Sequence, residues 1–341
     1  MSSPFPPGKL PAVVLARLLA QIKPDDPRVL VGPGIGLDAA VIDMGDRLLV
    51  AKSDPITFAT DSIGWYAVQV NANDLATTGA TPRWFLATVL LPQSRANEAM
   101  AESIFDQIHD ACAAMDVSLV GGHTEITYGL ERPIVVGAML GEVARDRLVT
   151  PSGAKPGDAL VLTKGISIEG TAIIAREQDL RGLPGLEGLD LERCRRFLTE
   201  PGISVVRDAA IATSAGRVHA MHDPTEGGLS TSLYEMAQAS NVGMMIEAGA
   251  VLVYPETLAL CRVLGLAPWG LIASGALLLA VESDDAPAIV RALEASGIRA
   301  AVIGRVTAPE RGVKLRRQAA LRDSIRQLPR FERDEIARLF E

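Results

Sequence analysis

The chain has 341 residues, of which 48% are hydrophobic and only 22% are charged, and this balance excludes an intrinsically disordered protein. Its formal net charge is −8, so a general nucleic-acid-binding surface is not expected, because such a surface needs clustered lysine and arginine. A chain of this length is expected to fold as two domains.

The cysteine content and the hydrophobic pattern also limit the class of protein to which this chain can belong. The three cysteines are far apart and form no Cys-x-x-Cys pair, which favours free thiols in a reducing cytoplasm. Prolines near the amino terminus break any signal-peptide pattern. The longest apolar stretch, residues 266–281, is shorter than the roughly 18–20 residues that span a bilayer. We therefore expect a cytoplasmic protein without a membrane partner.

The first part of the chain alternates helical and strand patterns. Residues 10–22 have apolar side chains at helical spacing, and two short apolar runs on either side of Gly45 predict a β-hairpin at residues 39–52. The other elements expected here are helices over residues 62–79 and 97–115 and strands over residues 84–90, 118–120 and 133–143.

A stretch rich in proline and glycine at residues 151–158 indicates a boundary between a domain of residues 1–150 and a domain of residues 151–341. The pattern beyond it predicts strands over residues 159–163, 244–248, 276–281 and 300–306, and helices over residues 169–177, 204–214, 229–239 and 286–296. This alternation predicts two α/β or α+β domains.

Three segments of the second part lie outside that alternation. Residues 180–191 are rich in glycine and are expected to form a surface excursion. The basic run at residues 314–317 is expected to be a solvated face of a helix or loop. Residues 332–339 have the spacing of an amphipathic helix.

Three aspartates are the main candidates for a metal site. Asp38 follows a glycine-rich loop, Asp54 precedes a proline, and Asp74 lies among small residues beside Asn71 and Asn73. Each aspartate taken alone is better explained by a turn or a helix cap. Together, three carboxylates with water and phosphate oxygens supply the hard ligands that Mg²⁺ prefers. We therefore predict Asp38, Asp54 and Asp74 as metal ligands, and Asn71 and Asn73 as cofactor-binding residues.

Lys52 stands two residues before Asp54 and is a candidate contact for a phosphate group, although a solvated lysine on an edge strand would look the same. The glycines at residues 32–36 lack the spacing of a dinucleotide-binding fingerprint, and the chain contains no P-loop motif. Any nucleotide site must therefore be of another type.

Residues 121–125 form a second glycine loop after a predicted strand. Backbone N–H groups in such a loop can approach a phosphate closely, although a simple turn is the alternative. The residues that we predict to bind a cofactor here are Gly121, Gly122, His123, Thr124 and Glu125.

The segment at residues 222–229 precedes a predicted helix. Free N–H groups at the start of that helix would suit an anion, although a mere capping turn is the alternative. We predict Gly227 and Gly228 as cofactor-binding residues. The catalytic candidates are His222, which could act as acid or base, Asp223 and Glu226.

Taken together, these stretches resemble the superfamily of aminoimidazole ribonucleotide (AIR) synthetase, PurM. Its relatives include thiamine monophosphate kinase, selenophosphate synthetase and the hydrogenase maturation factor HypE, and the resemblance is greatest to HypE. The resemblance covers nearly the whole chain. The residues that carry it are G-I-G-L-D-A-A-V (34–41), S-D-P-I-T-F-A-T-D (53–61), V-N-A-N-D-L-A (70–76), G-G-H-T-E (121–125), G-A-K-P-G-D-A-L-V-L-T-K-G (153–165), I-E-G-T-A (168–172) and H-D-P-T-E-G-G-L (222–229).

The resemblance implies an N-terminal α/β domain that dimerises by joining its sheets into a barrel, and a C-terminal α/β domain packed against it. It further implies that ATP and Mg²⁺ lie in the cleft between the domains, with Asp38, Asp54 and Asp74 as metal and phosphate carboxylates and residues 121–125 as a second phosphate loop. Members of the superfamily use ATP to phosphorylate an oxygen atom, which then leaves.

The chain departs from the pattern at three places. Leu37 stands where many members have an aspartate, and His123 stands where an acidic residue is usual. HypE ends in Pro-Arg-x-Cys, whereas no cysteine follows Cys261 here and ten residues follow Phe331. The resemblance therefore implies a homodimer that transfers a phosphoryl group to a separate small substrate or acts together with a partner protein. A kinase similar to thiamine monophosphate kinase and a non-catalytic nucleotide-binding accessory protein are the alternatives.

Overall fold

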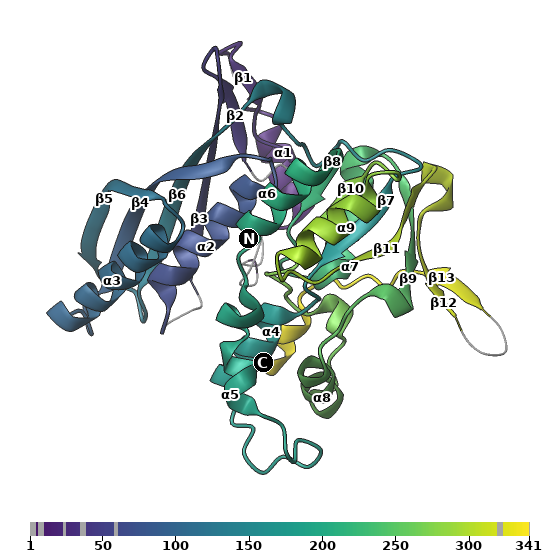
Figure 1. The fold of residues 1–341 in the computed structure, drawn as a ribbon. Helices are drawn as coiled ribbons and strands as arrows, with labels where there is room; N and C mark the ends of the chain where they lie inside the picture. Colours follow the sequence, from purple (N-terminus) through teal and green to yellow (C-terminus); the bar gives the residue numbers. More distant parts are fainter. Residues whose placement is uncertain are drawn as a thin grey trace.

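The computed structural model describes residue 5 and residues 10–22, 25–34, 39–57, 61–318 and 323–340. These residues form two β-sheets that lie beside each other, with helices packed around both (Figure 1). The first sheet takes its strands from residues 29–143 and the second from residues 159–327. The expected mixed α/β architecture is confirmed, whereas a domain boundary between residues 150 and 151 stays a prediction.

The first sheet has six strands in the order β1-β2-β3-β6-β4-β5, and all neighbours are antiparallel except β4 and β5. The predicted hairpin is confirmed, because β2 pairs with β3. Among the described residues the sheet is open at β1 and β5, so a single chain forms no closed barrel. The strands are Val29–Val31 (β1), Ala40–Asp43 (β2), Leu48–Ile56 (β3), Thr81–Pro92 (β4), Ser118–Thr127 (β5) and Ile134–Val143 (β6).

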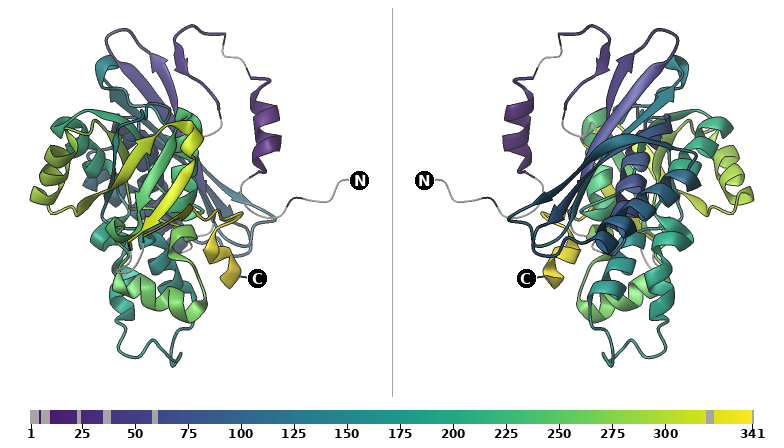
Figure 2. Two further views of the ribbon diagram at one scale, coloured as in Figure 1. Left: turned by 90° about the vertical axis from the view of Figure 1, so that its right-hand side faces the viewer. Right: turned by 90° about the vertical axis from the view of Figure 1, so that its left-hand side faces the viewer.

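Three predicted helices belong to this part of the chain, namely α1 (Ala12–Leu19), α2 (Ile63–Ala76) and α3 (Glu98–Ala114). Helices α2 and α3 pack together over the first sheet, where Phe85 and Ile108 are fully buried in the shared core. Helix α1 stands apart from this body of the protein (Figure 2).

The second sheet has seven strands in the order β13-β12-β9-β11-β7-β10-β8, and all neighbours are antiparallel except β9 and β12. Every residue of β7 and β10 is buried, because helices cover both faces of the sheet at these strands. The strands are Ala159–Thr163 (β7), Val218–His222 (β8), Gly243–Glu247 (β9), Leu278–Val281 (β10), Ala300–Thr307 (β11), Val313–Arg317 (β12) and Ser324–Gln327 (β13).

Alternate side chains of these central strands face different helices. Val161 and Leu279 pack with α6 (Val206–Ala215) and α9 (Ala286–Ala295). Leu160 and Leu278 belong to a separate core with α7 (Gly228–Ser240). The period of two along each strand thus separates two hydrophobic cores.

A lobe of helices lies below the two sheets in the view of Figure 1. It contains α4 (Ile168–Glu177), α5 (Leu191–Arg196), α8 (Pro255–Leu264) and the 3₁₀ helix η6 (Glu335–Leu339). The glycine-rich loop before α5 is mostly exposed, as expected, but its leucines at every third position turn inward to pack between α4 and α8. These leucines are Leu180, Leu183, Leu186 and Leu189.

Several details of the predicted elements are wrong. The basic run at residues 314–317 is strand β12, with Leu315 buried and Arg316 paired to Glu247, so only alternate side chains reach solvent. The carboxyl-terminal segment forms a 3₁₀ helix of five residues, not a longer amphipathic helix. Residues 121–125 continue strand β5 and are not a loop, since they pair with β4. The elements β1, β8, β13, α5 and α8 were not predicted.

Helix α2 is buried on nearly all sides, because the first sheet and α3 cover one face while the second half of the chain covers the other. Asn73, near its carboxyl end, joins the two halves. The side-chain amide of Asn73 donates to the backbone oxygen of Ile203 (2.8 Å) and accepts from the backbone N–H of Val205 (2.8 Å). An ion pair between Asp61 and Arg176 of α4 adds a second link.

We expect Asn73→Ala to lower the free energy of unfolding by about 2–4 kcal/mol, because two buried backbone groups lose their partner. Urea denaturation followed by circular dichroism measures this change. Gln93→Ala, which truncates an exposed amide in a turn, is the control and should change the stability little. A loss for Asn73→Ala no larger than that of the control would contradict the proposed link.

Candidate functional site

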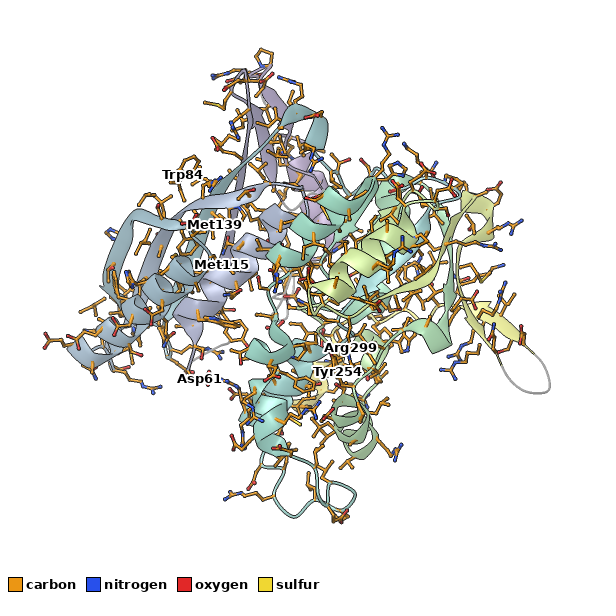
Figure 3. The ribbon with its side chains drawn as sticks, viewed as in Figure 1. Asp61, Trp84, Met115, Met139, Tyr254 and Arg299 are labelled. Atoms are coloured by element: carbon orange, nitrogen blue, oxygen red, sulfur yellow. The ribbon has the colours of Figure 1, made fainter. Side chains whose placement is uncertain are left out.

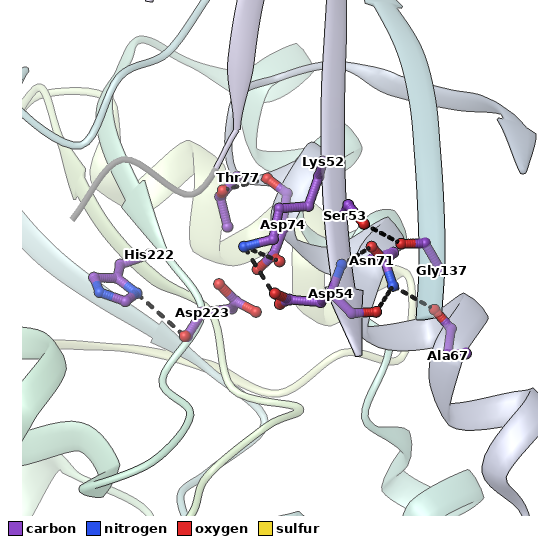
Figure 4. A network of polar contacts seen from close by, with 10 residues as sticks. All are labelled: Lys52, Ser53, Asp54, Ala67, Asn71, Asp74, Thr77, Gly137, His222 and Asp223. Carbon is purple, nitrogen blue, oxygen red and sulfur yellow. Dashed lines mark hydrogen bonds and ion pairs between the residues drawn. The ribbon is translucent and has the colours of Figure 1, made fainter. Parts of the chain in front are cut away.

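Lys52, Asp54 and Asp74 meet where strand β3 passes helix α2 (Figure 4). The side chains of Lys52 and Asp54 share one face of β3, because they are two residues apart. The Lys52 ammonium lies 2.9 Å from Oδ2 of Asp74 and 3.3 Å from Oδ2 of Asp54. The side chain of Asp74 is 7% exposed, whereas that of Asp54 is 36% exposed. One ammonium between two carboxylates leaves a formal surplus of one negative charge.

Asn71 fixes the backbone at Asp54. Its side-chain oxygen accepts from the N–H of Asp54 (2.9 Å), and its side-chain nitrogen donates to the backbone oxygens of Ala67 (2.8 Å) and Asp54 (3.3 Å). A Cβ at Gly137 would lie 2.4 Å from that nitrogen, so β6 needs glycine at this point. Asn71 and Asn73 therefore have their amide groups bound to backbone, and their contact with a cofactor stays a prediction.

A segment far away in the sequence reaches the same place. Asp223 follows strand β8, is 3% exposed, and points its side chain toward Lys52 and Asp54 in Figure 4. The imidazole of the neighbouring His222 instead forms a hydrogen bond through Nε2 with the carboxylate of Glu235 (2.9 Å). Its Nδ1 lies 3.1 Å from the backbone oxygen of Asp223. The structure thus brings Lys52, Asp54, Asp74 and Asp223 together.

The N–H groups expected to be free at the start of α7 are already bound. The N–H of Gly227 donates to Oδ2 of Asp334 (2.7 Å), and that of Gly228 donates to the backbone oxygen of Thr225 (3.0 Å). Asp334 belongs to the carboxyl-terminal segment at residues 328–340, which also packs the ring of Phe331 on Gly270. An anion of the protein itself therefore stands where we expected a ligand.

Glu169, a buried carboxylate of α4 near this segment, was not among the predicted site residues. Burial raises the pKa of Glu169 to about 7, the hydroxyl of Ser274 opposes the rise, and negative charge on Glu226, Asp334 and Asp223 adds to it. Burial likewise raises the pKa of Asp334 to about 6. Glu169 lies in the I-E-G-T-A stretch, but a single acidic residue at a helix start gives no signal of its pKa.

The residues predicted as a second phosphate loop lie away from this cluster. Strands β6 and β4 stand between β3 and β5, which places β5 roughly 14 Å from β3 at the usual strand spacing. Within one chain, Gly121, Gly122, His123, Thr124 and Glu125 therefore do not join Lys52. A Cβ at Gly122 would lie 1.9 Å from the backbone oxygen of Ala87, so strand pairing alone explains that glycine.

Only part of the predicted three-aspartate metal site lies among the residues that the structure describes. Asp38 lies outside the described residues, as does Leu37. Among the residues that the structure describes, no group of three or more histidine, cysteine, aspartate or glutamate side chains is arranged to hold a metal ion. The carboxylate oxygens of Asp54 and Asp74 are nevertheless the donor type that fits Mg²⁺, with phosphate oxygens and water completing its shell.

Glu169 makes the stability of the protein dependent on pH. A carboxyl group whose pKa is raised on folding binds more protons in the folded state, so stability declines as pH rises from its ordinary pKa of 4.5 to about 7. We expect Glu169→Gln to remove this decline and to be more stable than wild type above pH 7, by about 3 kcal/mol.

Urea denaturation at a series of pH values measures the effect of Glu169→Gln. Glu102→Gln changes an exposed residue of α3 and should leave the wild-type profile unchanged. Parallel profiles for Glu169→Gln and wild type would show that Glu169 does not titrate in this range.

Within the described part of the chain, no helix has both the length and the hydrophobicity needed to cross a membrane.

Comparisons with known proteins agree with this architecture. A protein of Methanocaldococcus jannaschii named for hydrogenase expression and formation is 30% identical over 83% of this chain and 84% of its own length. The carbamoyl dehydratase HypE of Rhodobacter capsulatus is 29% identical over 81% of this chain and 80% of its own length. The crystal structure of HypE in complex with ATP superposes with a TM-score of 0.73 over 92% of each chain, at 24% identity.

Both halves of the chain match the same family. Residues 36–143 match the N-terminal domain of AIR synthase related protein, and residues 155–315 match its C-terminal domain. The resemblance to HypE within this superfamily is thereby confirmed. The chain belongs to the AIR synthase related protein family.

Proposed function

We propose that this protein binds ATP with Mg²⁺ at the cluster of Lys52, Asp54 and Asp74 and transfers a phosphoryl group to an oxygen atom of a separate small substrate. The observation that carries the proposal is the convergence of two carboxylates and one ammonium, of which Asp74 is buried and Asp54 is partly exposed. The surplus negative charge there favours a cation.

The side chains suit the parts of a magnesium nucleotide. Asp54 and Asp74 would hold Mg²⁺, which would supply positive charge to offset the negative charge of the phosphate groups. Lys52 would donate to a phosphate oxygen once an ion competes for its two carboxylates. Asp38 stays a proposed third ligand. The relatives named above support this proposal, because one similar structure holds ATP.

The second half of the chain would supply proton transfer. Glu235 orients the imidazole of His222, and a histidine so held can accept or donate a proton. Asp223, which points toward Lys52, would face the reacting phosphate (Figure 4). Glu226 is proposed to act near Asp223, because the negative charges of both residues raise the pKa of Glu169.

The three cysteines favour an acceptor that is not part of this chain. Cys112, Cys194 and Cys261 are all buried, and burial raises the pKa of their thiols to about 11, 11 and 12. Since the thiolate is the reactive form, none of them is a nucleophile at neutral pH. Buried reduced thiols also agree with the proposed cytoplasmic location.

One observation favours the alternative of a nucleotide-binding accessory protein. Asp334 occupies the N–H of Gly227, so the start of α7 has no free amide there for a substrate anion. A protein of this kind would bind ATP without turnover and would act through a partner protein. Substrate-dependent release of ADP or AMP separates the two functions.

We expect Asp74→Asn to weaken Mg²⁺-dependent ATP binding roughly 10–100-fold, because a charged contact is lost. Calorimetric titration of ATP with and without Mg²⁺ measures this, and circular dichroism checks that the variant folds. Asp106→Asn on the exposed face of α3 is the matched control and should bind as wild type does. Absence of binding to the wild type would sink the proposal.

We also propose that the protein is a homodimer that joins two first sheets at β5. Nine of the ten residues of β5 are exposed, including Leu119, Val120 and Ile126. A long edge strand with exposed apolar side chains invites pairing with another strand. Pairing at β5 would also bring residues 121–125 of each chain to a neighbouring subunit, where they could complete the nucleotide site and close a barrel.

We expect the double variant Val120→Asp with Ile126→Asp to sediment as a monomer, because two carboxylates would be buried in the interface. Analytical ultracentrifugation gives the mass. Phe105→Asp, which places the same charge on an exposed apolar position of α3, is the control and should stay dimeric. A wild-type monomer at micromolar concentration would exclude the proposed dimer.

A further inference from the structure

A cavity lies in the helical lobe, outside the cluster of Lys52. Its volume is about 440 Å³, which falls in the range of small-molecule sites. Its walls come from α5 and the turn after it, from the residue before α8, and from the loop before β11. The lining residues are Arg193, Arg196, Phe197, Glu200, Pro201, Tyr254 and Arg299.

Three arginines in one cavity are unexpected in a chain with a net charge of −8. Arg193 pairs with Glu256 (Nε to Oε1, 3.1 Å). Within the described part of the chain, the guanidinium groups of Arg196 and Arg299 have no hydrogen-bond or ion-pair partner. Two guanidinium groups beside one cavity are therefore available to a ligand.

Two aromatic side chains line the cavity. The rings of Phe197 and Tyr254 meet edge to face at 5.1 Å, and both side chains are buried. The hydroxyl of Tyr254 donates to the backbone oxygen of Lys164 (3.0 Å), which fixes the ring. Arg299 lies beside Tyr254 in Figure 3. Burial raises the pKa of Tyr254, and the positive charge of Arg299 opposes that rise, which places the guanidinium within electrostatic reach of the ring.

The chemistry of these groups selects a class of ligand. A guanidinium group binds phosphate and carboxylate oxygens through paired N–H donors, and it does so better than an ammonium group. Glu200 is the acceptor in the lining and suits a hydroxyl or amino group of the ligand. A cavity volume of about 440 Å³ limits the ligand to a small molecule.

We propose that this cavity binds a small metabolite that carries phosphate or carboxylate groups together with a hydroxyl group. Arg196 and Arg299 hold the oxyanions, Glu200 accepts from the hydroxyl, and Phe197 and Tyr254 form the apolar floor. The site shares no residue with the cluster of Lys52, and it binds without Mg²⁺.

The test is calorimetric titration of two probes, citrate and 3-phosphoglycerate, into the full chain in the presence of a chelator of divalent ions. The anionic groups of citrate are carboxylates only, whereas 3-phosphoglycerate also carries a phosphate, and both molecules have a hydroxyl group. Binding of citrate would therefore show that carboxylates suffice, and binding of 3-phosphoglycerate alone would show that the phosphate is needed. We expect at least one probe to bind at millimolar concentrations or below. Arg196→Gln and Arg299→Gln should each weaken binding about tenfold, and the double variant about a hundredfold.

Two controls make the result specific. Arg291→Gln removes an exposed arginine of α9 outside the cavity and should bind as wild type does. Asp74→Asn should also bind the probe as wild type does, whether or not ATP binds at the cluster of Lys52. The proposal is overturned if neither probe binds the wild type, or if the double variant binds as tightly as Arg291→Gln.

Discussion

The burial of α2 on nearly every side governs the arrangement of the rest of the molecule. A helix covered by a sheet on one face and by other helices on the opposite face has no solvent-exposed stripe for polar side chains. Its polar residues must find partners inside the protein, because an unpaired buried amide or carboxylate costs free energy. Asn71 therefore forms hydrogen bonds with the backbone of β3, and Asn73 forms hydrogen bonds with the backbone just before α6. Asp74 forms an ion pair with Lys52. Each of these contacts ties α2 to a different part of the fold.

The same burial explains why the cluster of Lys52 suits ion chemistry. Charges interact more strongly where water is excluded, so an ammonium that serves two carboxylates leaves a local field that attracts a further cation. Hydrogen bonds between the side chain of Asn71 and the backbone of Asp54 keep Asp54 in place, and its carboxylate is partly exposed. A site whose groups are held by buried neighbours loses little entropy when it binds a ligand.

The carboxyl-terminal segment limits what can bind at the start of α7. Asp334 is covalently attached and accepts from Gly227, so an external anion must compete with a carboxylate present at high effective concentration. Burial raises the pKa of Glu169 to about 7 and that of Asp334 to about 6, and negative charge on neighbouring acidic groups adds to each rise. Protonation would weaken the acceptor strength of Asp334, which links the occupancy of this amide to pH.

Local patterns in the sequence predicted most of the elements in the first and second sheets. The hairpin at Gly45 and the strand at residues 159–163 follow from apolar runs and turn residues, which act over a few positions. The resemblance carried by short motifs led to the right family. The same patterns did not reveal β8 or β13. Short segments with polar residues form strands only when they pair with neighbouring strands in the sheet.

The sequence by itself determined which chemical groups are present and which family they belong to, because motif composition is a property of the chain. Only the tertiary structure decided which groups meet. It placed Asp223 beside the cluster of Lys52, put the Gly-Gly-His-Thr-Glu segment on a distant edge strand, and bound Asp334 to an amide that we expected to be free. The physical reason is that these contacts join segments more than a hundred residues apart, and packing selects them through burial and hydrogen bonding that no local pattern encodes.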